Sequence, residues 1–260
     1  MGLLSDRVAV VTGAGRGIGR VIALALAEEG AQLVLAGRSV DALEQTAKVA
    51  GGTERDALVV STDVTLPDQV DALARATLEA FGRVDVLVNN SGVGGPSAPL
   101  WEVDQADWEA TMAVNVTGTY LCCRAFLPAM VGRGSGSVVI IGSMTGKRPL
   151  VGRTAYATSK MALVGLARTL AAEAGPYGVR VNVVSPGPVE GERIEWVIER
   201  QAEALGVTVE EARTRFTSAS PLDRLVPPED VAAATVFLAS DRAASITGED
   251  LNVSAGVVMY

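Results

Sequence analysis

The alternation of two kinds of segment is the feature that most constrains the fold of this chain. Short runs rich in Val, Ile and Leu alternate with longer stretches whose apolar residues recur at helical spacing, as from Val70 to Phe81. Several of the short runs are apolar throughout, which is typical of parallel strands covered on both faces. The pattern predicts an α/β fold built on a doubly wound parallel sheet. The strands expected in it span residues 7–12, 32–36, 57–61, 84–89, 137–142, 179–184 and 250–253.

No linker rich in Ser, Pro or Gly divides the chain, so residues 1–260 are predicted to form a single Rossmann-type domain with about seven strands. The alternation is interrupted once, by an insertion at about 187–226 that contains two charged, helical pieces around 192–204 and 209–217. Long excursions in compact domains are usually lids or binding loops. We expect this one to cover a substrate, the alternative being a surface addition or a subunit contact.

Composition excludes several classes of protein. The chain has no histidine, which removes Ser-His-Asp and Cys-His catalysis and nearly every His-containing metal site, so no metal is expected. Its two cysteines, Cys122 and Cys123, are adjacent and cannot build a disulfide framework, which indicates a reducing compartment.

Charge and hydropathy exclude further partners. The net charge of −8 does not favour nucleic acid as a partner, because a phosphate backbone attracts a basic face. No apolar stretch reaches the roughly 18 residues of a membrane span, and the beginning of the chain lacks the pattern of a signal peptide. We therefore expect a soluble, cytoplasmic protein.

A glycine-rich turn follows the first expected strand directly and opens the first helix. Gly13, Gly15, Gly17 and Gly19 alternate with other residues there, although their spacing is not G-x-G-x-x-G. Glycine permits positive φ and lets backbone N–H groups approach a pyrophosphate, and the helix N-terminus adds partial positive charge. On the first strand of a doubly wound sheet, this turn predicts a bound dinucleotide.

The end of the second strand indicates which dinucleotide. Proteins that bind NAD usually place an acid there for the ribose 2′-hydroxyl. This chain has Arg38 instead, and its next acid is Asp41. Arg38, together with Arg16 from the glycine turn, could pair with a 2′-phosphate. The sequence favours NADP(H) as the cofactor, with NAD(H) as the alternative.

A tyrosine and a lysine supply the acid–base chemistry that the missing histidine cannot. Tyr156 and Lys160 are four residues apart in a segment with the pattern of a helix start, so they share one face. An ammonium group near a phenol lowers the phenol pKa from its usual value of about 10. Tyr156 is therefore a candidate acid/base.

Several motifs in register carry a resemblance that runs from Arg7 to about Val253. In the order and approximate spacing of its motifs, the chain resembles the short-chain dehydrogenase/reductase family. The matching residues are the turn at 12–19, Asn89-Asn90-Ser91-Gly92, Asn115, Ser143, Tyr156-x-x-x-Lys160 and Pro186-Gly187.

The resemblance implies hydride transfer between a nicotinamide cofactor and a carbonyl/secondary alcohol pair. It makes Tyr156 the general acid/base and gives Lys160 two tasks: lowering the Tyr156 pKa and holding the nicotinamide ribose. Ser143 would hydrogen-bond the substrate oxygen, and Asn115 would hold a water that connects Lys160 to solvent. Two alternative functions remain open from the sequence: a 3-oxoacyl (carrier protein) reductase and a non-catalytic dinucleotide-binding sensor.

The cofactor contacts expected from the resemblance extend along the whole strand edge. Family members often have threonine where this chain has Gly191, so we expect the backbone around Val189 to take over the contact with the carboxamide. The full expected set is Gly13, Gly15, Arg16, Gly17, Ile18, Gly19, Arg38, Asp63, Val64, Asn90, Tyr156, Lys160, Pro186, Gly187 and Val189.

The substrate is expected to be a small molecule in a largely apolar pocket. The residues predicted to line that pocket are Ser143, Met144, Gly94, Val151 and Trp196. Glu190, Glu192 and Arg193 could orient a polar substrate, but solvated charges at a helix end are the preferred interpretation. Members of the family commonly form tetramers, so the resemblance implies a homotetramer, with a dimer as the alternative, through helices expected at about 104–130 and 155–174.

Overall fold

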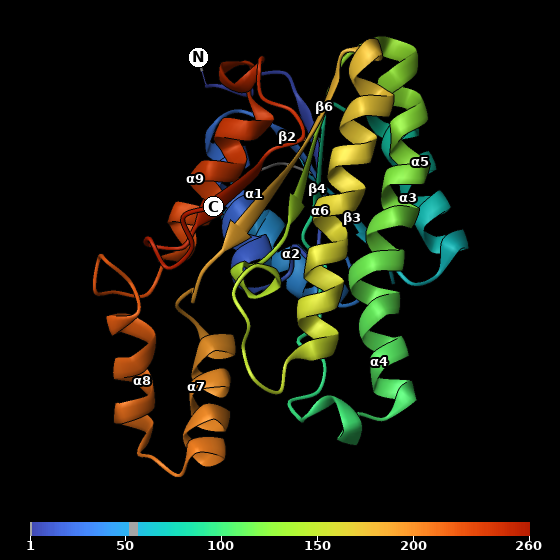
Figure 1. The fold of residues 1–260 in the computed structure, drawn as a ribbon. Helices are drawn as coiled ribbons and strands as arrows, with labels where there is room; N and C mark the ends of the chain where they lie inside the picture. Colours follow the sequence, from blue (N-terminus) through green and yellow to red (C-terminus); the bar gives the residue numbers. More distant parts are fainter. Residues whose placement is uncertain (1, 52–56) are drawn as a thin grey trace.

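The computed structural model describes residues 2–51 and 57–260, which form a seven-stranded parallel sheet between two layers of helices (Figure 1). The strand order is β3-β2-β1-β4-β5-β6-β7, so the predicted Rossmann-type fold with seven strands is confirmed. The strands are β1 Val8–Thr12, β2 Gln32–Gly37, β3 Ala57–Ser61, β4 Val86–Asn89, β5 Gly136–Ile141, β6 Val179–Pro186 and β7 Asp250–Val253. The ends of each strand lie within about two residues of the predicted bounds, a difference that is ordinary at strand ends.

The helices fall into two groups and a separate pair. One face of the sheet packs against α3, α5 and α6, and the other against α1, α2 and α9. The helices described are α1 Gly17–Glu28, α2 Val40–Val49, α3 Pro67–Phe81, α4 Gln105–Met112, α5 Gly118–Arg133, α6 Thr154–Ala174, α7 Glu192–Leu205, α8 Val209–Ser218 and α9 Pro228–Ala239. In the described part of the chain, no helix combines the length and the apolarity needed to cross a bilayer.

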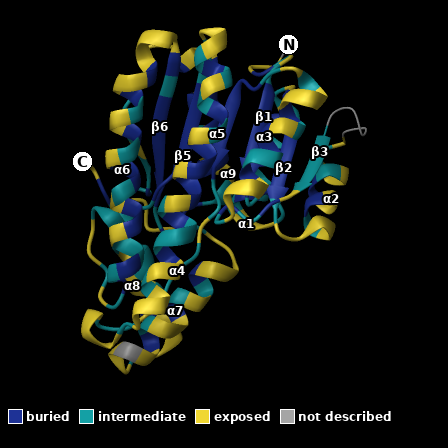
Figure 2. Cartoon of the chain, turned by 90° about the vertical axis from the view of Figure 1, so that its right-hand side faces the viewer, coloured by how far each residue is buried: buried dark blue, intermediate teal, exposed yellow. Residues whose placement is uncertain are grey.

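Burial on both faces explains why the strands are apolar throughout. Along β1, Val8 and Val10 pack into the core on the α5 side, while Ala9 and Val11 pack on the α1 side. All four residues are at most 1% exposed, as Figure 2 shows for the central strands. A polar residue on either face would face a helix, so the strands lack the alternation of a half-exposed sheet.

The strand order reverses between β1 and β4, and this point organises the functional edge. The chain runs outward from β1 to β3, returns through α3 to β4, and continues in the other direction. At the carboxyl ends of β1 and β4, the Thr12 hydroxyl accepts hydrogen bonds of 3.0 Å from the backbone N–H groups of Asn90 and Ser91. Ligands of open α/β sheets bind at such a point.

The insertion is a helical hairpin that closes on itself at its base. Val189 and Val226 form an isolated parallel bridge, and Glu190 donates to the Val226 carbonyl at 2.9 Å. Helices α7 and α8 extend away from the sheet below its carboxyl edge (Figure 1). They bury a small apolar cluster of their own, which consists of Ile194, Ile198, Ala202, Ala212 and Leu225.

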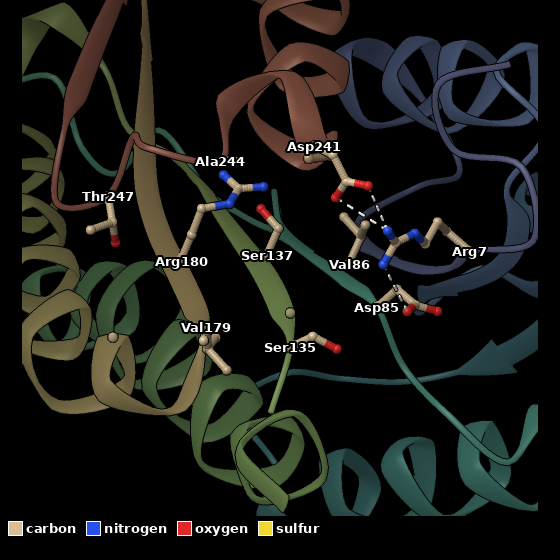
Figure 3. A pocket seen from close by; sticks show the side chains of 14 residues that line it. Arg7, Asp85, Val86, Ser135, Ser137, Val179, Arg180, Asp241, Ala244 and Thr247 are labelled. Carbon is tan, nitrogen blue, oxygen red and sulfur yellow. Dashed lines mark hydrogen bonds and ion pairs between the residues drawn. The ribbon is translucent and has the colours of Figure 1, made fainter. Parts of the chain in front are cut away.

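The opposite, amino edge of the sheet contains a hollow of about 320 Å³ (Figure 3). Arg7 pairs there with Asp241 at 2.9 Å and with Asp85 at 3.5 Å, and Arg180 donates to backbone carbonyls. Asp85 is almost completely buried and also pairs with Arg83 at 2.5 Å and Arg133 at 2.7 Å. This network joins the starts of β1, β4 and β5, so we assign it to stability.

Candidate active site

The first turns of α6 carry the candidate acid/base and its neighbouring lysine. Lys160 is 5% exposed, and its Nζ lies 5.9 Å from the centroid of the Tyr156 ring. The same Nζ donates to the Ile141 carbonyl at the end of β5 at 2.7 Å. The ammonium group is thus fixed between α6 and the sheet, on the helix face that Tyr156 shares.

The surroundings of Tyr156 favour its ionised form. Burial raises the pKa of the Tyr156 phenol, but Arg193, Lys160, a hydrogen bond with Ser143, and Arg153 together hold it below its ordinary value. Burial lowers the pKa of Lys160, and the charge of Arg193 acts in the same direction, while Tyr156 opposes both. A phenol with a lowered pKa can give or take a proton closer to neutral pH.

Ser143 follows β5 and begins a short 3-10 turn, Met144–Gly146. Its hydroxyl accepts from the Thr145 N–H at 3.2 Å, and hydrogen bonding from its side chain contributes to the lowered pKa of Tyr156. The strand end therefore places a hydroxyl beside the phenol, where both can reach one substrate oxygen. This is the arrangement that the resemblance implies for the two residues.

Asn115 lies in a π-helical turn, Ala113–Thr117, between α4 and α5. Its side chain is completely buried, accepts from the Val93 N–H at 2.8 Å, and donates to the Val93 carbonyl at 3.0 Å. A Cβ on Gly92 would lie 3.3 Å from Asn115 Oδ1 and 3.5 Å from Lys160 Nζ. Glycine there keeps a small space open between the two groups, which suits the predicted water. The water itself stays a prediction.

The glycine turn has the shape of a phosphate cradle. Gly13 and Gly17 have φ of +67° and +54°, and α1 begins at Gly17 with no acidic residue in its first turn. A Cβ on Gly19 would overlap the Asn90 amide and the Gly13 carbonyl, and a Cβ on Gly15 would lie 2.9 Å from that of Ala42. The turn therefore requires glycines and presents a free helix N-terminus, which fits the pyrophosphate of a dinucleotide.

Two residues that are predicted to contact the cofactor have side chains that make contacts within the protein. The Asn90 amide donates to the carbonyls of Thr12 at 3.0 Å and Gly13 at 3.3 Å, so it supports the glycine turn. Val64 is 6% exposed and packs at the start of α5, where a Cβ on Gly118 would lie 2.7 Å from its Cγ2. For Val64 and Asn90, contact with the cofactor through other atoms stays a prediction.

Adjacent strand ends bring an arginine and an aspartate to the expected adenosine end of the site. Arg38 follows β2 and is exposed, as is Arg16 before α1. Asp63 follows β3, and hydrogen bonds from the Thr65 backbone and hydroxyl, with the charge of Arg38, hold its pKa below the ordinary value although burial opposes them. A cation and a hydrogen-bonding carboxylate thus flank this end, and Ile18 packs its half-buried side chain against the core.

The end of β6 leads into the insertion. Gly187 donates to the Val253 carbonyl at 2.8 Å, and a Cβ on it would lie 2.7 Å from Ser254 Cα, so Pro186-Gly187 is held against β7. Gly191 has φ of +129°, a conformation almost restricted to glycine. Threonine at that position would be strained, which explains why the chain departs from the family pattern there.

The predicted substrate residues are only partly brought together. Gly94 and Trp196 meet at Arg153, which donates to the Gly94 carbonyl at 2.8 Å and lies 5.7 Å from the Trp196 ring. Met144 is half-buried beside Ser143. Val151 is 85% exposed, so it does not form the wall of an enclosed pocket in this structure, contrary to the prediction.

Sequence reasoning missed Arg153, and it interpreted Arg193 as a solvated charge: Arg193 is indeed exposed at the start of α7, but its contact with Tyr156 was not predicted. The guanidinium carbons of Arg153 and Arg193 lie 5.2 Å and 5.1 Å from the centroid of the Tyr156 ring. Arg153 is three residues before Tyr156, a spacing that could have been noticed. Arg193 is brought in only by the fold of the insertion, for which the sequence gives no signal.

Comparison with known proteins identifies the family. Residues 13–258 match a family model described as enoyl-(acyl carrier protein) reductase. A 3-oxoacyl-[acyl-carrier-protein] reductase of Synechocystis is 36% identical, with all of both chains covered. Together with the fold and the active-site residues, these matches show that the chain belongs to the short-chain dehydrogenase/reductase family.

Two solved structures support the class of cofactor. An actinorhodin polyketide ketoreductase with NADPH has a TM-score of 0.93 and 35% identity, with all of both chains covered. A xylitol dehydrogenase with bound NAD⁺ has a TM-score of 0.92 and 30% identity, covering 97% of this chain and 99% of that one. The protein is therefore an oxidoreductase that transfers hydride between a nicotinamide cofactor and a carbonyl/alcohol pair.

Proposed function

We propose that this protein interconverts a ketone and a secondary alcohol with NADP(H), and that Tyr156 is the general acid/base. The observation that carries the proposal is the placement of Tyr156, whose ring has Arg153, Lys160 and Arg193 within 5.1 to 5.9 Å and whose pKa these cations and Ser143 lower. The bound nicotinamide supplies or accepts the hydride. The protein positions the substrate oxygen and moves the proton.

The residues divide this work in the direction of reduction. Tyr156 gives its phenolic proton to the carbonyl oxygen as the carbonyl carbon gains hydride, and Ser143 donates a hydrogen bond to the same oxygen. Lys160 stabilises the phenolate that remains. A water held by Asn115 then returns a proton towards Tyr156. In the direction of oxidation, each proton moves the opposite way.

The preference for NADP(H) is proposed from Arg38 and Arg16. Both are exposed cations, and Arg38 lies within electrostatic range of Asp63 at the ends of β2 and β3. Parallel fluorescence titrations with NADPH and NADH test this preference. We expect tighter binding of NADPH in the wild type and a shift towards NADH in Arg38→Asp. The control is Arg75→Asp on α3. If the ratio of NADPH affinity to NADH affinity in Arg38→Asp equals that of the wild type and of the control, Arg38 does not bind the 2′-phosphate.

The catalytic role of Tyr156 is tested by Tyr156→Phe, with Tyr177→Phe as control because Tyr177 lies exposed after α6. We expect Tyr156→Phe to lose at least about a thousandfold in kcat, since it removes the transferred proton. NADPH binding is expected to stay as in the wild type. Turnover that persists in Tyr156→Phe would refute the assignment.

A carrier-linked 3-oxoacyl substrate is the second candidate, favoured by the Synechocystis relative. The net charge of −8 argues against it, because an acidic carrier is attracted by a basic surface. Turnover of a 3-oxoacyl carrier protein well above that of the same acyl group on a small thioester would establish this candidate.

The whole chain is proposed to act as one catalytic domain, with residues 187–226 as a cover over the substrate. We further propose a homotetramer through α5 and α6, where Tyr120 and Met161 are 46% and 48% exposed. Sedimentation tests the assembly, and a monomer at micromolar concentration would contradict it. A cytoplasmic location agrees with two buried free thiols, at Cys122 and Cys123.

A further inference from the structure

Three cationic side chains converge on Tyr156 from different elements. Lys160 belongs to α6, Arg153 immediately precedes α6, and Arg193 lies in the first turn of α7. Their charged groups lie between 5.1 and 5.9 Å from the centroid of the Tyr156 ring. One lysine is sufficient for the family's acid/base chemistry, so the two arginines require a separate explanation.

Arg153 is buried to an extent that is unusual for a charge without an acidic partner. It is 3% exposed, and burial lowers its pKa. One nitrogen, Nη2, donates to the Gly94 carbonyl, whereas Nε is buried without a hydrogen-bond partner in the described structure. Buried charges are normally paired, because the loss of hydration is otherwise uncompensated.

No carboxylate balances this cluster within residues 2–51 and 57–260. The ion pairs found there include none with Arg153, Lys160 or Arg193. Within the insertion, Glu195 is paired with Arg213 instead. A chain with a net charge of −8 thus concentrates unpaired positive charge beside its reacting phenol.

The two guanidinium groups reach the same space above Gly94. A Cβ built on Gly94 would lie 3.2 Å from Arg153 Nη2 and 3.6 Å from Arg193 Nη2. A side chain at this position would crowd Arg153 and would contact Arg193. Planar guanidinium groups bind carboxylates and phosphates through paired N–H donors, so two of them at one place form a receptor for one anion.

We propose that the substrate carries an anionic group, a carboxylate or a phosphate ester, and that Arg153 and Arg193 bind it beside the reacting carbonyl. This inference rests on the proposed function and narrows it to oxo acids or phosphorylated ketones and the corresponding alcohols. Because Arg193 belongs to the insertion, binding of the anion also holds α7 over the substrate. Arg153 is fixed by Gly94 and supplies the stationary half of the receptor.

The competing explanation is that the arginines act only on Tyr156. In that case Arg193 would lower the Tyr156 pKa for every substrate alike, charged or neutral. The two explanations differ in one measurable respect: a receptor discriminates an acid from its neutral ester, and a pKa effect does not.

The experiment compares three forms of one substrate skeleton: a series of short oxo acids, their methyl esters, and ketones with a phosphate ester at the same distance. For each form, kcat/KM is measured with NADPH in the wild type, Arg193→Gln and Arg215→Gln. Arg215 is an exposed residue of α8 in the same insertion, and its substitution changes the net charge equally. Arg153→Lys is added because it keeps the buried charge while removing the planar fork.

We expect the wild type to prefer an anionic form over the ester, and Arg193→Gln to lower this preference about ten- to a hundredfold, as for a lost hydrogen bond to a charged group. The loss should appear mainly in KM for the anionic form and should exceed the change for the ester, which reports only the effect of Arg193 on the Tyr156 pKa. Arg215→Gln should behave as the wild type, and Arg153→Lys should lose part of the preference. Comparison of the acid and phosphate arms identifies the anion.

Two results would overturn the inference without touching the proposed function. One is turnover of neutral ketones with no preference for an anion. The other is an Arg193→Gln variant in which the acid and the ester change by the same factor, with only the pH profile displaced. Absence of turnover for every carbonyl with both cofactors, in a protein that binds neither, would instead contradict the proposed function itself.

Discussion

The substitution Gly19→Ala tests how the glycine turn forms the cofactor site. Gly19 lies in the first turn of α1 and has no positive φ, so alanine is not excluded by backbone conformation. The added methyl group would overlap the Asn90 amide and the backbone carbonyl of Gly13. The amide can move only by giving up its bonds to Thr12 and Gly13, and the carbonyl only by displacing the turn.

The size of the effect follows from these contacts. Overpacking in a closely packed site costs about 1–3 kcal/mol, and each lost hydrogen bond of Asn90 costs about 0.5–1.5 kcal/mol. With both bonds lost, we therefore expect a total of about 2–6 kcal/mol. The lower value already corresponds to roughly 30-fold weaker NADPH binding if the cofactor needs the turn in its present shape.

Fluorescence titration with NADPH measures the affinity, and thermal unfolding without cofactor measures the stability. Each 1 kcal/mol lowers the Tm of a chain this long by roughly 2–4 °C. Gly132→Ala is the control, because Gly132 lies in α5 with open space around it and alanine favours a helix. A Gly19→Ala variant with wild-type affinity and Tm would show that the overlap is relieved without consequence.

Three further predictions concern stability, the insertion and the thiols. Burial raises the Asp85 pKa, but the hydrogen bonds from Arg83 and from the Val8 N–H, with the charge of Arg133, hold it below the ordinary value. Asp85→Asn should therefore cost about 2–3 kcal/mol near neutral pH, with a Tm difference that shrinks as the pH falls below about 4. A difference that is constant with pH would contradict this. Ile198→Ala removes a buried contact between α7 and α8, and we expect faster proteolysis within 187–226 and a higher KM, while the Tm of the main fold changes little. If the insertion of Ile198→Ala is cleaved no faster than that of the wild type, the insertion does not depend on its own apolar cluster for its packing. Burial raises the pKa of the Cys122 and Cys123 thiols to about 12, so a thiol reagent at about pH 8 should label them only after unfolding; rapid labelling of the native protein would be inconsistent with their burial.

The fold could be predicted from the sequence because its strands carry a strong and repeated signal. Strands buried on both faces are apolar along most of their length, as at residues 8–11, and the helices between them keep helical spacing. The pairing of Tyr156 with Lys160 was equally visible, since four residues along one helix fix the distance without knowledge of the tertiary structure.

The parts of the site that escaped prediction depend on tertiary contacts. Asn90 follows β4, yet its amide is used by the turn after β1, and only the reversal of strand order makes them neighbours. Arg193 is 37 residues from Tyr156 in sequence and reaches it only because the tertiary structure places the first turn of α7 beside the start of α6. Local sequence patterns indicate the chemistry of a side chain, whereas its contact partners depend on how helices and strands are arranged in space, which local patterns do not specify.

The bridge between Val189 and Val226 has a consequence for how the protein can change. Because the insertion leaves and rejoins the sheet at neighbouring residues and contains its own apolar cluster, the segment between them can be lengthened, shortened or exchanged at little risk to the strands. With the proposed role of the insertion as a cover over the substrate, replacing this one segment would change the substrate range while the glycine turn and Tyr156 stay in place. A graft of another helical hairpin between these two valines offers a direct route to redesign.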